Sequence, residues 1–307
     1  MNLILKSQIQ EFSLKVFYWR PQRTRKIVLC RPRGGLNDML CQINKCRVYA
    51  IKYNRDLWID GIRSGFCDCL GNYFEPSRGF YFGSPIGTVC SEDSCFPNSL
   101  AYKLNSYKQS WDPSSNTFVD KETGIPLTFD FNSDYSETLL LHEQGGGGLQ
   151  SIRALSVMQL KPEIKQKIKD IIESLGEYDS IHIRNTDLKT DYKHFFSQLK
   201  DKINARVVVC TDDLSVQQYA KDFWGDQLII LHNLPDRGGK ALHSPYYKTL
   251  DKYTLNVKTL IDLFVLASAK NFYKCKTHRG RISGFARLAE SLRSHPRVLK
   301  KMLIPNP

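Results

Sequence analysis

Long apolar runs are missing from this sequence of 307 residues. No segment approaches the roughly 20 consecutive apolar residues that a helix needs to cross a bilayer, so we expect no membrane-spanning helix. A secretory signal peptide is not expected either, because Lys6, Gln8, Gln10 and Glu11 interrupt the apolar residues near the amino terminus. These absences predict a cytoplasmic protein.

The amino-terminal segment nevertheless combines bulky apolar residues with a following group of basic ones. Such a segment can lie on an anionic membrane surface, as a peripheral contact at the inner face of the membrane. Packing against the protein's own sheet is the alternative, and the sequence leaves both open. The residues concerned are Leu3, Ile4, Ile9, Phe12, Leu14, Val16, Phe17 and Trp19, followed by Arg20, Arg23, Arg25 and Lys26.

Metal-binding spacings are absent as well. The chain has nine cysteines, and the close pairs Cys67/Cys69 and Cys90/Cys95 lack the CxxC spacing and the paired histidines of a structural zinc site. Other cysteines lie in apolar segments, where cysteine behaves as a small buried residue. We therefore expect no metal site, no cofactor and a reducing compartment.

Acidic residues are in deficit. The chain has 44 Lys and Arg against 31 Asp and Glu, a formal net charge of +13. A basic surface suits nucleic acid, an anionic membrane or a phosphorylated substrate. Because no helix-turn-helix, zinc-finger or aromatic RNA-binding signature occurs, we expect no nucleic acid partner.

The glycine signatures of common nucleotide-binding motifs are missing too, since neither GxGxxG nor the Walker A pattern occurs. Gly34 and Gly35 nevertheless stand between a predicted strand (residues 26–30) and a helical pattern. Glycines there let a ligand approach the backbone and the N–H groups at the start of the helix. A tight strand–helix turn is the alternative, but Arg31 and Arg33 beside the glycines favour an anionic ligand.

Alternating strand and helix patterns predict an α/β fold with two Rossmann-like domains that face a cleft, at residues 1–150 and 151–307. The glycine run at residues 145–148 allows a hinge near the domain boundary, and alternatively it allows a ligand to lie directly against the backbone. Between residues 61 and 132 the pattern is weak and predicts short helices and long loops. The predicted strands cover residues 26–30, 57–60, 138–142, 178–184, 205–210, 227–231 and 271–274, and the predicted helices cover residues 36–53, 149–160, 161–175, 192–199, 214–224, 253–269 and 283–292.

An arginine and an acid follow the strand predicted at residues 178–184, in which His182 and Arg184 alternate with isoleucines. Ligands of open α/β sheets bind beyond the carboxyl ends of the strands. The planar guanidinium of Arg184 suits a phosphate or pyrophosphate there. A surface ion pair between Arg184 and Asp187 is the alternative.

Two further loops carry groups that suit a nucleotide. Asp212 and Asp213 follow the strand at residues 205–210, where acids accept hydrogen bonds from a ribose or a base edge or cap the next helix. Thr277 and Ser283 lie in a basic, glycine-containing loop before the last predicted helix. That loop suits a pyrophosphate cradle, and a serine-capped loop is the alternative.

Four segments occur in a fixed order along the chain: Gly34-Gly35-Leu36-Asn37-Asp38, His182-Ile183-Arg184-Asn185-Thr186-Asp187, Thr211-Asp212-Asp213 and Ser283-Gly284-Phe285. This order resembles the fucosyltransferase-like branch of the GT-B glycosyltransferases, and within it the α1,6-fucosyltransferases and nodulation fucosyltransferases. The resemblance is strongest over residues 26–60 and 138–290. The order of the segments is more specific than any one of them.

The resemblance implies an inverting, metal-independent enzyme with a GDP-linked sugar donor as substrate, held mainly by residues 151–307, while residues 1–150 face the acceptor. Arg184 would contact the β-phosphate and His182 would lie near the nucleotide. Asp212 or Asp213 would meet the guanine or ribose, and Thr277 and Ser283 would bind the diphosphate. The donor-binding candidates are Gly34, Gly35, Asn37, His182, Asp212, Asp213, Thr277, Arg279, Ser283 and Gly284.

The sequence departs from the family pattern around the arginine. Asn185 stands where a second arginine is common, Leu188 replaces a lysine, and Tyr192 occupies the neighbourhood of an expected glutamate. The general base that deprotonates the acceptor hydroxyl is therefore open. The catalytic candidates are Arg184, Asp187 and Asp191, with Asp38 and Glu143 from the other half as weaker candidates for the base.

The main hypothesis is a transferase that moves fucose from GDP-fucose to a glycan or lipid-linked glycan acceptor in the synthesis of a surface polysaccharide. One alternative keeps the fold and uses another nucleotide sugar. The other is a non-catalytic basic protein that binds glycan or nucleic acid, and binding to a phosphate backbone would weaken steeply with ionic strength.

Overall fold

The computed structural model describes residues 26–76, 79–86, 94–234 and 251–304. The apolar and basic amino-terminal segment lies outside these ranges except for Lys26, and so does Cys90. Within them, no helix combines the length and apolar content needed to cross a membrane.

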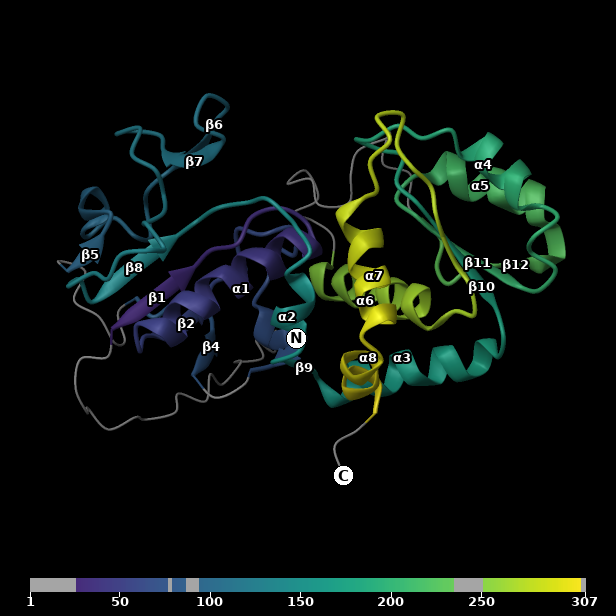
Figure 1. Cartoon of the computed structure of the whole chain (residues 1–307), viewed down its shortest axis with the longest axis horizontal. Coiled ribbons are helices and arrows are strands. Elements are labelled where there is room, and N and C mark those ends of the chain that lie inside the picture. Colours follow the sequence, from purple (N-terminus) through teal and green to yellow (C-terminus); the bar gives the residue numbers. More distant parts are fainter. Residues whose placement is uncertain (1–25, 77–78, 87–93, 235–250, 305–307) are drawn as a thin grey trace, which may run out of the picture.

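Five parallel strands form a sheet in the first half of the chain: β1 (Ile27–Cys30), β2 (Asp56–Ile59), β4 (Phe80–Phe82), β5 (Cys95–Phe96) and β8 (Leu139–His142). Their order is β4-β2-β1-β8-β5. The neighbours β1 and β8 are buried along their whole length, which is typical of parallel strands covered on both faces. Helix α1 (Leu36–Lys52) connects β1 to β2 and runs beside the sheet (Figure 1).

Four parallel strands form a sheet in the second half: β10 (Asp179–Ile183), β11 (Val207–Thr211), β12 (Leu228–Ile229) and β13 (Phe272–Lys274). Their order is β12-β11-β10-β13. The helices of this half are α2 (Ser151–Leu155), α3 (Pro162–Leu175), α4 (Tyr192–Leu199), α5 (Leu214–Trp224), α6 (Lys252–Ser268), α7 (Gly284–Ser294) and α8 (Pro296–Leu303).

Alternate residues of β11 point to two different helical layers. Val207 and Val209 belong to a cluster with side chains of α4 and α5, whereas Val208 and Cys210 belong to the larger cluster that contains the buried side of α6. This period of two is the normal geometry of a strand between two layers. The α/β class predicted from the sequence is therefore confirmed.

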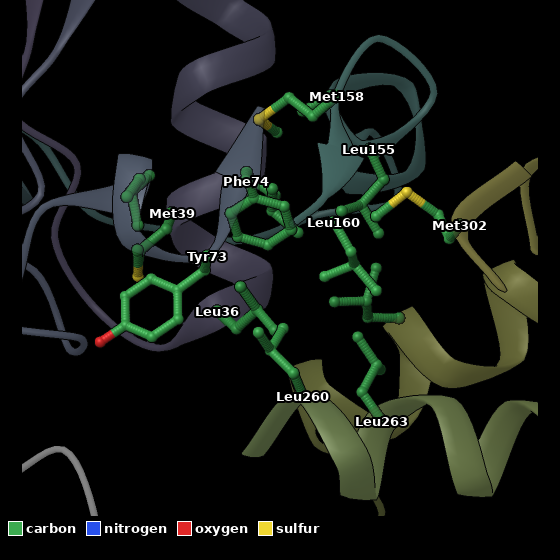
Figure 2. Packing of buried hydrophobic residues seen from close by; sticks show 14 of the residues in the cluster. Leu36, Met39, Tyr73, Phe74, Leu155, Met158, Leu160, Leu260, Leu263 and Met302 are labelled. Atoms are coloured by element: carbon green, nitrogen blue, oxygen red, sulfur yellow. The ribbon is translucent and has the colours of Figure 1, made fainter. Parts of the chain in front are cut away.

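One continuous apolar cluster links the two halves. Figure 2 shows side chains of α1, α6 and α8 facing a short antiparallel pair, β3 (Phe74–Glu75) and β9 (Gln159–Leu160). Buried Asn256 of α6 donates hydrogen bonds to the Phe66 carbonyl at 3.0 Å and to the Tyr73 hydroxyl at 2.8 Å. Packing and hydrogen bonds thus join the two halves of the chain. The domain boundary at residue 150 stays a prediction.

The helix predicted at residues 149–160 is wrong in its second half. Helix α2 ends at Leu155, and Gln159 and Leu160 pair with β3 instead, a contact that no local pattern encodes. Helix α8 was not predicted, although Pro296 occupies its first turn, a favoured position for proline. The weakly patterned region contains the hairpin β6 (Gln109–Asp112) and β7 (Thr117–Asp120), 3₁₀ turns and loops.

Candidate active site

Side chains that follow the strands of the first sheet, together with Tyr107, form a network around buried Arg31 and Glu143, which we call the first-sheet network (Arg31, Arg33, Asp60, Arg63, Tyr107 and Glu143). Its outer members Arg33 and Arg63 keep 18% and 24% of their side chains exposed. Arg31 follows β1 and is 2% exposed. Its Nε lies 2.9 Å from Asp60 Oδ2, and its Nη1 donates to the Tyr107 hydroxyl at 2.9 Å. Because both ends of its guanidinium have protein partners, Arg31 has a structural role, in contrast to the anionic ligand expected from the sequence.

Glu143, the residue after β8, is the acidic centre of the first-sheet network and is fully buried. It accepts a hydrogen bond from the Tyr107 hydroxyl. Arg33 Nη1 lies 3.5 Å from its Oε1, and Arg63 Nη1 lies 3.3 Å from its Oε2. A carboxylate enclosed in this way balances buried positive charge, which makes it a poor acceptor for a substrate proton.

The glycine run lies over the start of α1. Gly35 is the N-cap of the helix, and Asn37 in its first turn accepts a hydrogen bond from Ser151 Oγ at 2.8 Å. A Cβ atom at Gly147 would lie 2.8 Å from Asn37 Nδ2 and would overlap the carboxylate of Asp38. Any larger residue at Gly147 would displace the side chains of Asn37 and Asp38, so this glycine lets the run lie close to the start of α1.

A chain of side-chain hydrogen bonds holds the glycine run in place. Gln42 of α1 donates from Nε2 to the carbonyls of Gly145 at 2.9 Å and Gly146 at 2.5 Å. Its Oε1 lies 2.9 Å from His142 Nε2, and His142 Nδ1 lies 2.7 Å from Thr128 Oγ1. Burial, with the charge of Lys45, lowers the pKa of His142 to about 3. Neutral His142 therefore donates to Gln42 and accepts from Thr128.

Arg184 follows β10 and forms a two-point ion pair. Its Nε lies 2.7 Å from Asp187 Oδ1, its Nη2 lies 2.8 Å from Asp187 Oδ2, and Nε lies 3.5 Å from Asp212 Oδ2. Burial lowers the pKa of Arg184, but the hydrogen bond that it donates to Asp187 and the charges of Asp212, Asp187 and Asp38 raise it overall. With 22% of its side chain exposed, Arg184 is a charged group that a ligand can reach.

His182 lies inside β10, beneath Arg184. It is 7% exposed, and its ring centre is 5.4 Å from that of Phe285 at the start of α7. Burial and then the charge of Arg184 lower its pKa to about 3. His182 is therefore a neutral side chain at physiological pH and serves as a hydrogen-bonding or packing group rather than a cation.

Asn185, which appeared in the sequence as a departure from the family pattern, organises the loop after β10. Its N–H donates to Asp212 at 2.8 Å and its Nδ2 donates to Asp213 at 2.8 Å. Its Oδ1 accepts from Thr190 N at 3.0 Å and Thr190 Oγ1 at 3.1 Å. An arginine has no acceptor atom, so it could not receive the hydrogen bonds from Thr190.

Three acids of the second half accept hydrogen bonds from nearby groups. Asp213 caps α5 by accepting from Ser215 N at 2.8 Å, and although burial raises its pKa, the hydrogen bonds from Ser215 and Asn185 lower it overall. Asp212 accepts from Thr186 Oγ1 at 2.6 Å. Asp191 caps α4 through a 3.2 Å bond from His194 N. The capping role considered for the Asp212-Asp213 pair is confirmed for Asp213.

The start of α7 lies against the start of α1. Ser283 caps α7 by accepting from Ala286 N at 3.1 Å. A Cβ atom at Gly284 would lie 3.2 Å from Asn37 Nδ2, which brings two helix amino termini together (Figure 1). The amino terminus of a helix carries a partial positive charge, which favours an anion.

The loop before α7 is tied to the loop after β10. Thr277 pairs with Thr190 in an isolated bridge, and His278 N donates to the Lys189 carbonyl at 2.9 Å. Thr277 Oγ1 accepts from Arg281 N at 3.1 Å, while Arg279 is exposed. The structure thus gathers Asn37, Arg184 and Ser283 with their loops around one region, where Asp38 is close enough to influence the pKa of Arg184.

No group of three or more His, Cys, Asp or Glu residues within the described ranges could hold a metal ion. Within these ranges the free thiols include Cys30, Cys41, Cys46, Cys67, Cys69, Cys210 and Cys275.

No protein-family model matches this sequence, and no curated protein matches it. Its structure is similar to that of the fucosyltransferase NodZ from Bradyrhizobium, at 17% identity and a TM-score of 0.58, over 87% of this chain and 91% of NodZ. The structure of NodZ alpha-1,6-fucosyltransferase soaked with GDP-fucose matches at 18% identity and a TM-score of 0.58, over 87% of this chain and 92% of that one. The chain therefore has the fucosyltransferase-like GT-B fold expected from its sequence.

Proposed function

We propose that this chain is a glycosyltransferase that transfers fucose from GDP-fucose to a glycan acceptor, in the synthesis of a surface polysaccharide. The observation that carries the proposal is the meeting of the amino termini of α1 and α7 beside Arg184. Two helix termini and one reachable guanidinium form a site for a diphosphate. The fold supports GDP-fucose as donor, since NodZ with this fold was soaked with it.

In this proposal the diphosphate replaces Asp187 as the two-point partner of Arg184. The Nε and Nη2 atoms that now meet Asp187 also suit two phosphate oxygens. The Thr277 and Ser283 loop and Arg279 complete the cradle, and Gly34, Gly35 and Gly284 give the diphosphate access to backbone N–H groups. Positive groups held in place before the reaction stabilise the charge that develops on the leaving GDP without a metal ion.

The same exchange makes Asp187 the proposed base. When the diphosphate takes over Arg184, the Asp187 carboxylate, 45% exposed, becomes available to receive the proton of the acceptor hydroxyl. Attack from the opposite side of the sugar then inverts the anomeric centre. Asp191 is the weaker candidate because its carboxylate caps α4.

The remaining second-half candidates face the nucleoside. Neutral His182 contacts it without adding charge, and Asp212 or Asp213 accepts hydrogen bonds from guanine or ribose after the loop adjusts. Residues 151–307 hold most of the donor, with the start of α1 at the diphosphate, and residues 1–150 face the acceptor. Catalysis in the cytoplasm, with peripheral membrane contact for a lipid-linked acceptor, completes the proposal.

The first test is nucleotide selectivity. A ligand that binds only the folded state raises its melting temperature, so GDP and GDP-fucose should raise it more than UDP or CMP do. Arg184→Ala should weaken GDP binding roughly 10- to 100-fold, the value of a charge-assisted contact. Lys270→Ala, which removes an exposed ion pair with Glu177, is the control. Equal shifts with all three nucleotides, or unchanged GDP affinity in Arg184→Ala, would contradict the proposal.

The second test concerns the base. Asp187→Asn should lower the rate of GDP release from GDP-fucose in the presence of acceptor oligosaccharides by roughly 10²- to 10⁴-fold. Asp191→Asn is a matched comparison, because asparagine also caps helices and should leave the rate nearly unchanged. The opposite pattern would transfer the role to Asp191.

A further inference from the structure

An open groove of about 480 Å³ runs along α1, and we call it the α1 groove. One side consists of α1 residues, among them Lys45, Val48 and Lys52, and the other of Phe131, Gly146 to Gly148, and Arg153 at α2. The α1 groove shares the glycine run with the proposed diphosphate site and extends away from it along α1.

The charged side chains that line the α1 groove are all positive. The described residues that line it include Lys45, Lys52 and Arg153 and no carboxylate. Their charges act on groups nearby: after burial, Arg153 lowers the pKa of Arg47, and after burial, Lys45 lowers that of His142. The pKa of Asp130 is lowered mainly by hydrogen bonds from the Asn132 backbone and Ser133, and the charge of Lys52 lowers it further. The α1 groove therefore attracts an anion.

An aromatic wall gives the α1 groove a second property. Lys45 Nζ lies 4.1 Å from the centre of the Phe131 ring, and Phe131 stacks on Phe129 with centres 4.5 Å apart. The part of Phe131 that stays exposed offers apolar surface to the C–H groups of a sugar. Gln150 and Asn44 also line the groove and carry amide groups that suit hydroxyls. Aromatic, amide and cationic groups together match a carbohydrate that carries negative charge.

The position of the α1 groove connects it to the donor side. Gly147, which lines it, also lies against Asn37 at the start of α1, where the proposed diphosphate site begins. A chain that occupies the α1 groove therefore ends beside that site. This continuity favours an acceptor over an unrelated ligand.

We propose that the α1 groove binds the acceptor and that the acceptor is an acidic oligosaccharide with carboxylate or phosphate groups. This inference rests on the proposed glycosyltransferase function. Lys45, Lys52 and Arg153 contact the acidic groups, and Phe131 contacts a sugar ring.

The test measures binding to the full chain of a galacturonic acid hexasaccharide, its carboxyl-reduced neutral counterpart and a phosphorylated mannose oligosaccharide. At least one acidic probe should bind more tightly than the neutral one, and added salt should reduce the difference. Lys45→Gln with Arg153→Gln should weaken acidic binding about tenfold. The control variant, Lys202→Gln with Lys221→Gln, removes two exposed cations that do not line the α1 groove. It should change the binding of the acidic probes little.

The outcomes separate the inference from the function. If GDP still raises the melting temperature but neither acidic probe binds better than the neutral one, the acidic acceptor is overturned and the proposed function stands. Equal losses in both double variants would also overturn it, since binding would then follow net charge alone. Binding to anionic lipid vesicles but not to the oligosaccharides would assign the α1 groove to a membrane surface and contradict the proposal. Failure of GDP to bind the unmodified chain would remove the proposed function itself.

Discussion

The first and second sheets both place charged residues directly after their strands, but the outcomes differ. In the first sheet, Arg31 keeps 3% of its side chain exposed and Glu143 keeps 0%. In the second, Arg184 keeps 22% of its side chain exposed and Asp187 keeps 45%. The comparison teaches that a charged residue at a strand end is a candidate for ligand binding only if its partners leave it reachable.

Loss of the acid at the centre of the first-sheet network should have the largest effect on stability. Glu143→Ala leaves Arg33 and Arg63 without their buried carboxylate, and breaking such a pair costs about 3–5 kcal/mol. The free energy of unfolding, measured in urea, should fall by this amount. If Glu143→Ala lowers the free energy of unfolding by less than Arg184→Ala does, the contrast between the two sheets is wrong.

The matching change in the second sheet should act on binding rather than on folding. Arg184→Ala should reduce GDP affinity by about 1.5–3 kcal/mol and lower the free energy of unfolding by less than about 1 kcal/mol, as for an exposed ion pair. Calorimetric titration with GDP and urea unfolding provide the two values. A stability loss larger than the binding loss would show that Arg184 is structural, like Arg31.

The two buried histidines allow a comparison by pH. The pKa values of His142 and His182 are lowered to about 3 in the folded chain, against an ordinary value of about 6.5. The unfolded chain therefore takes up these protons first, and the stabilisation present above pH 6.5 is lost as the pH falls toward 3. Between pH 4 and 6, each histidine should contribute about 1.4 kcal/mol per pH unit.

Single variants test each contribution to that slope. His182→Gln and His142→Gln should each reduce the pH dependence of unfolding by one proton, measured in urea at a series of pH values. An unchanged slope would show that the histidine is protonated in the folded state.

A change in the loop after β10 should have the smallest effect of these variants. Asn185→Ala removes the acceptor of Thr190 N and one donor to Asp213, which should lower the free energy of unfolding by about 1 kcal/mol. GDP affinity should fall with it, because the loop positions Arg184. Asn185→Ser at the same position is the control, since a hydroxyl retains one acceptor. Unchanged affinity in Asn185→Ala would separate the loop from the donor site.

The sequence was most informative where function depends on neighbours along the chain. The strand at residues 26–30, the glycines before α1, and the caps Asp213 and Ser283 follow local rules for strands and helix ends. They were predicted because each needs only a few adjacent residues. The order of the motifs along the chain then led to the prediction of the GT-B fold.

Contacts between distant residues were beyond the sequence. Tyr107 and Glu143 are 36 positions apart, and β3 and β9 meet from different halves of the chain. The α1 groove combines one helix face with Phe131 and Arg153, so no single segment signals it. Asn185 stood out in the sequence only as a departure from the family pattern. Its role depends on Thr190, Asp212 and Asp213, and these partners come together only when the loops after two different strands meet.

The hydrogen-bond chain from Thr128 through His142 and Gln42 has a kinetic consequence. Because the carbonyls of Gly145 and Gly146 are already held by Gln42, a ligand meets a loop with little freedom left to lose, despite its glycines. Association at this loop should therefore proceed as the docking of preformed surfaces, without a slow ordering step. Gln42→Ala should introduce that step and slow ligand association.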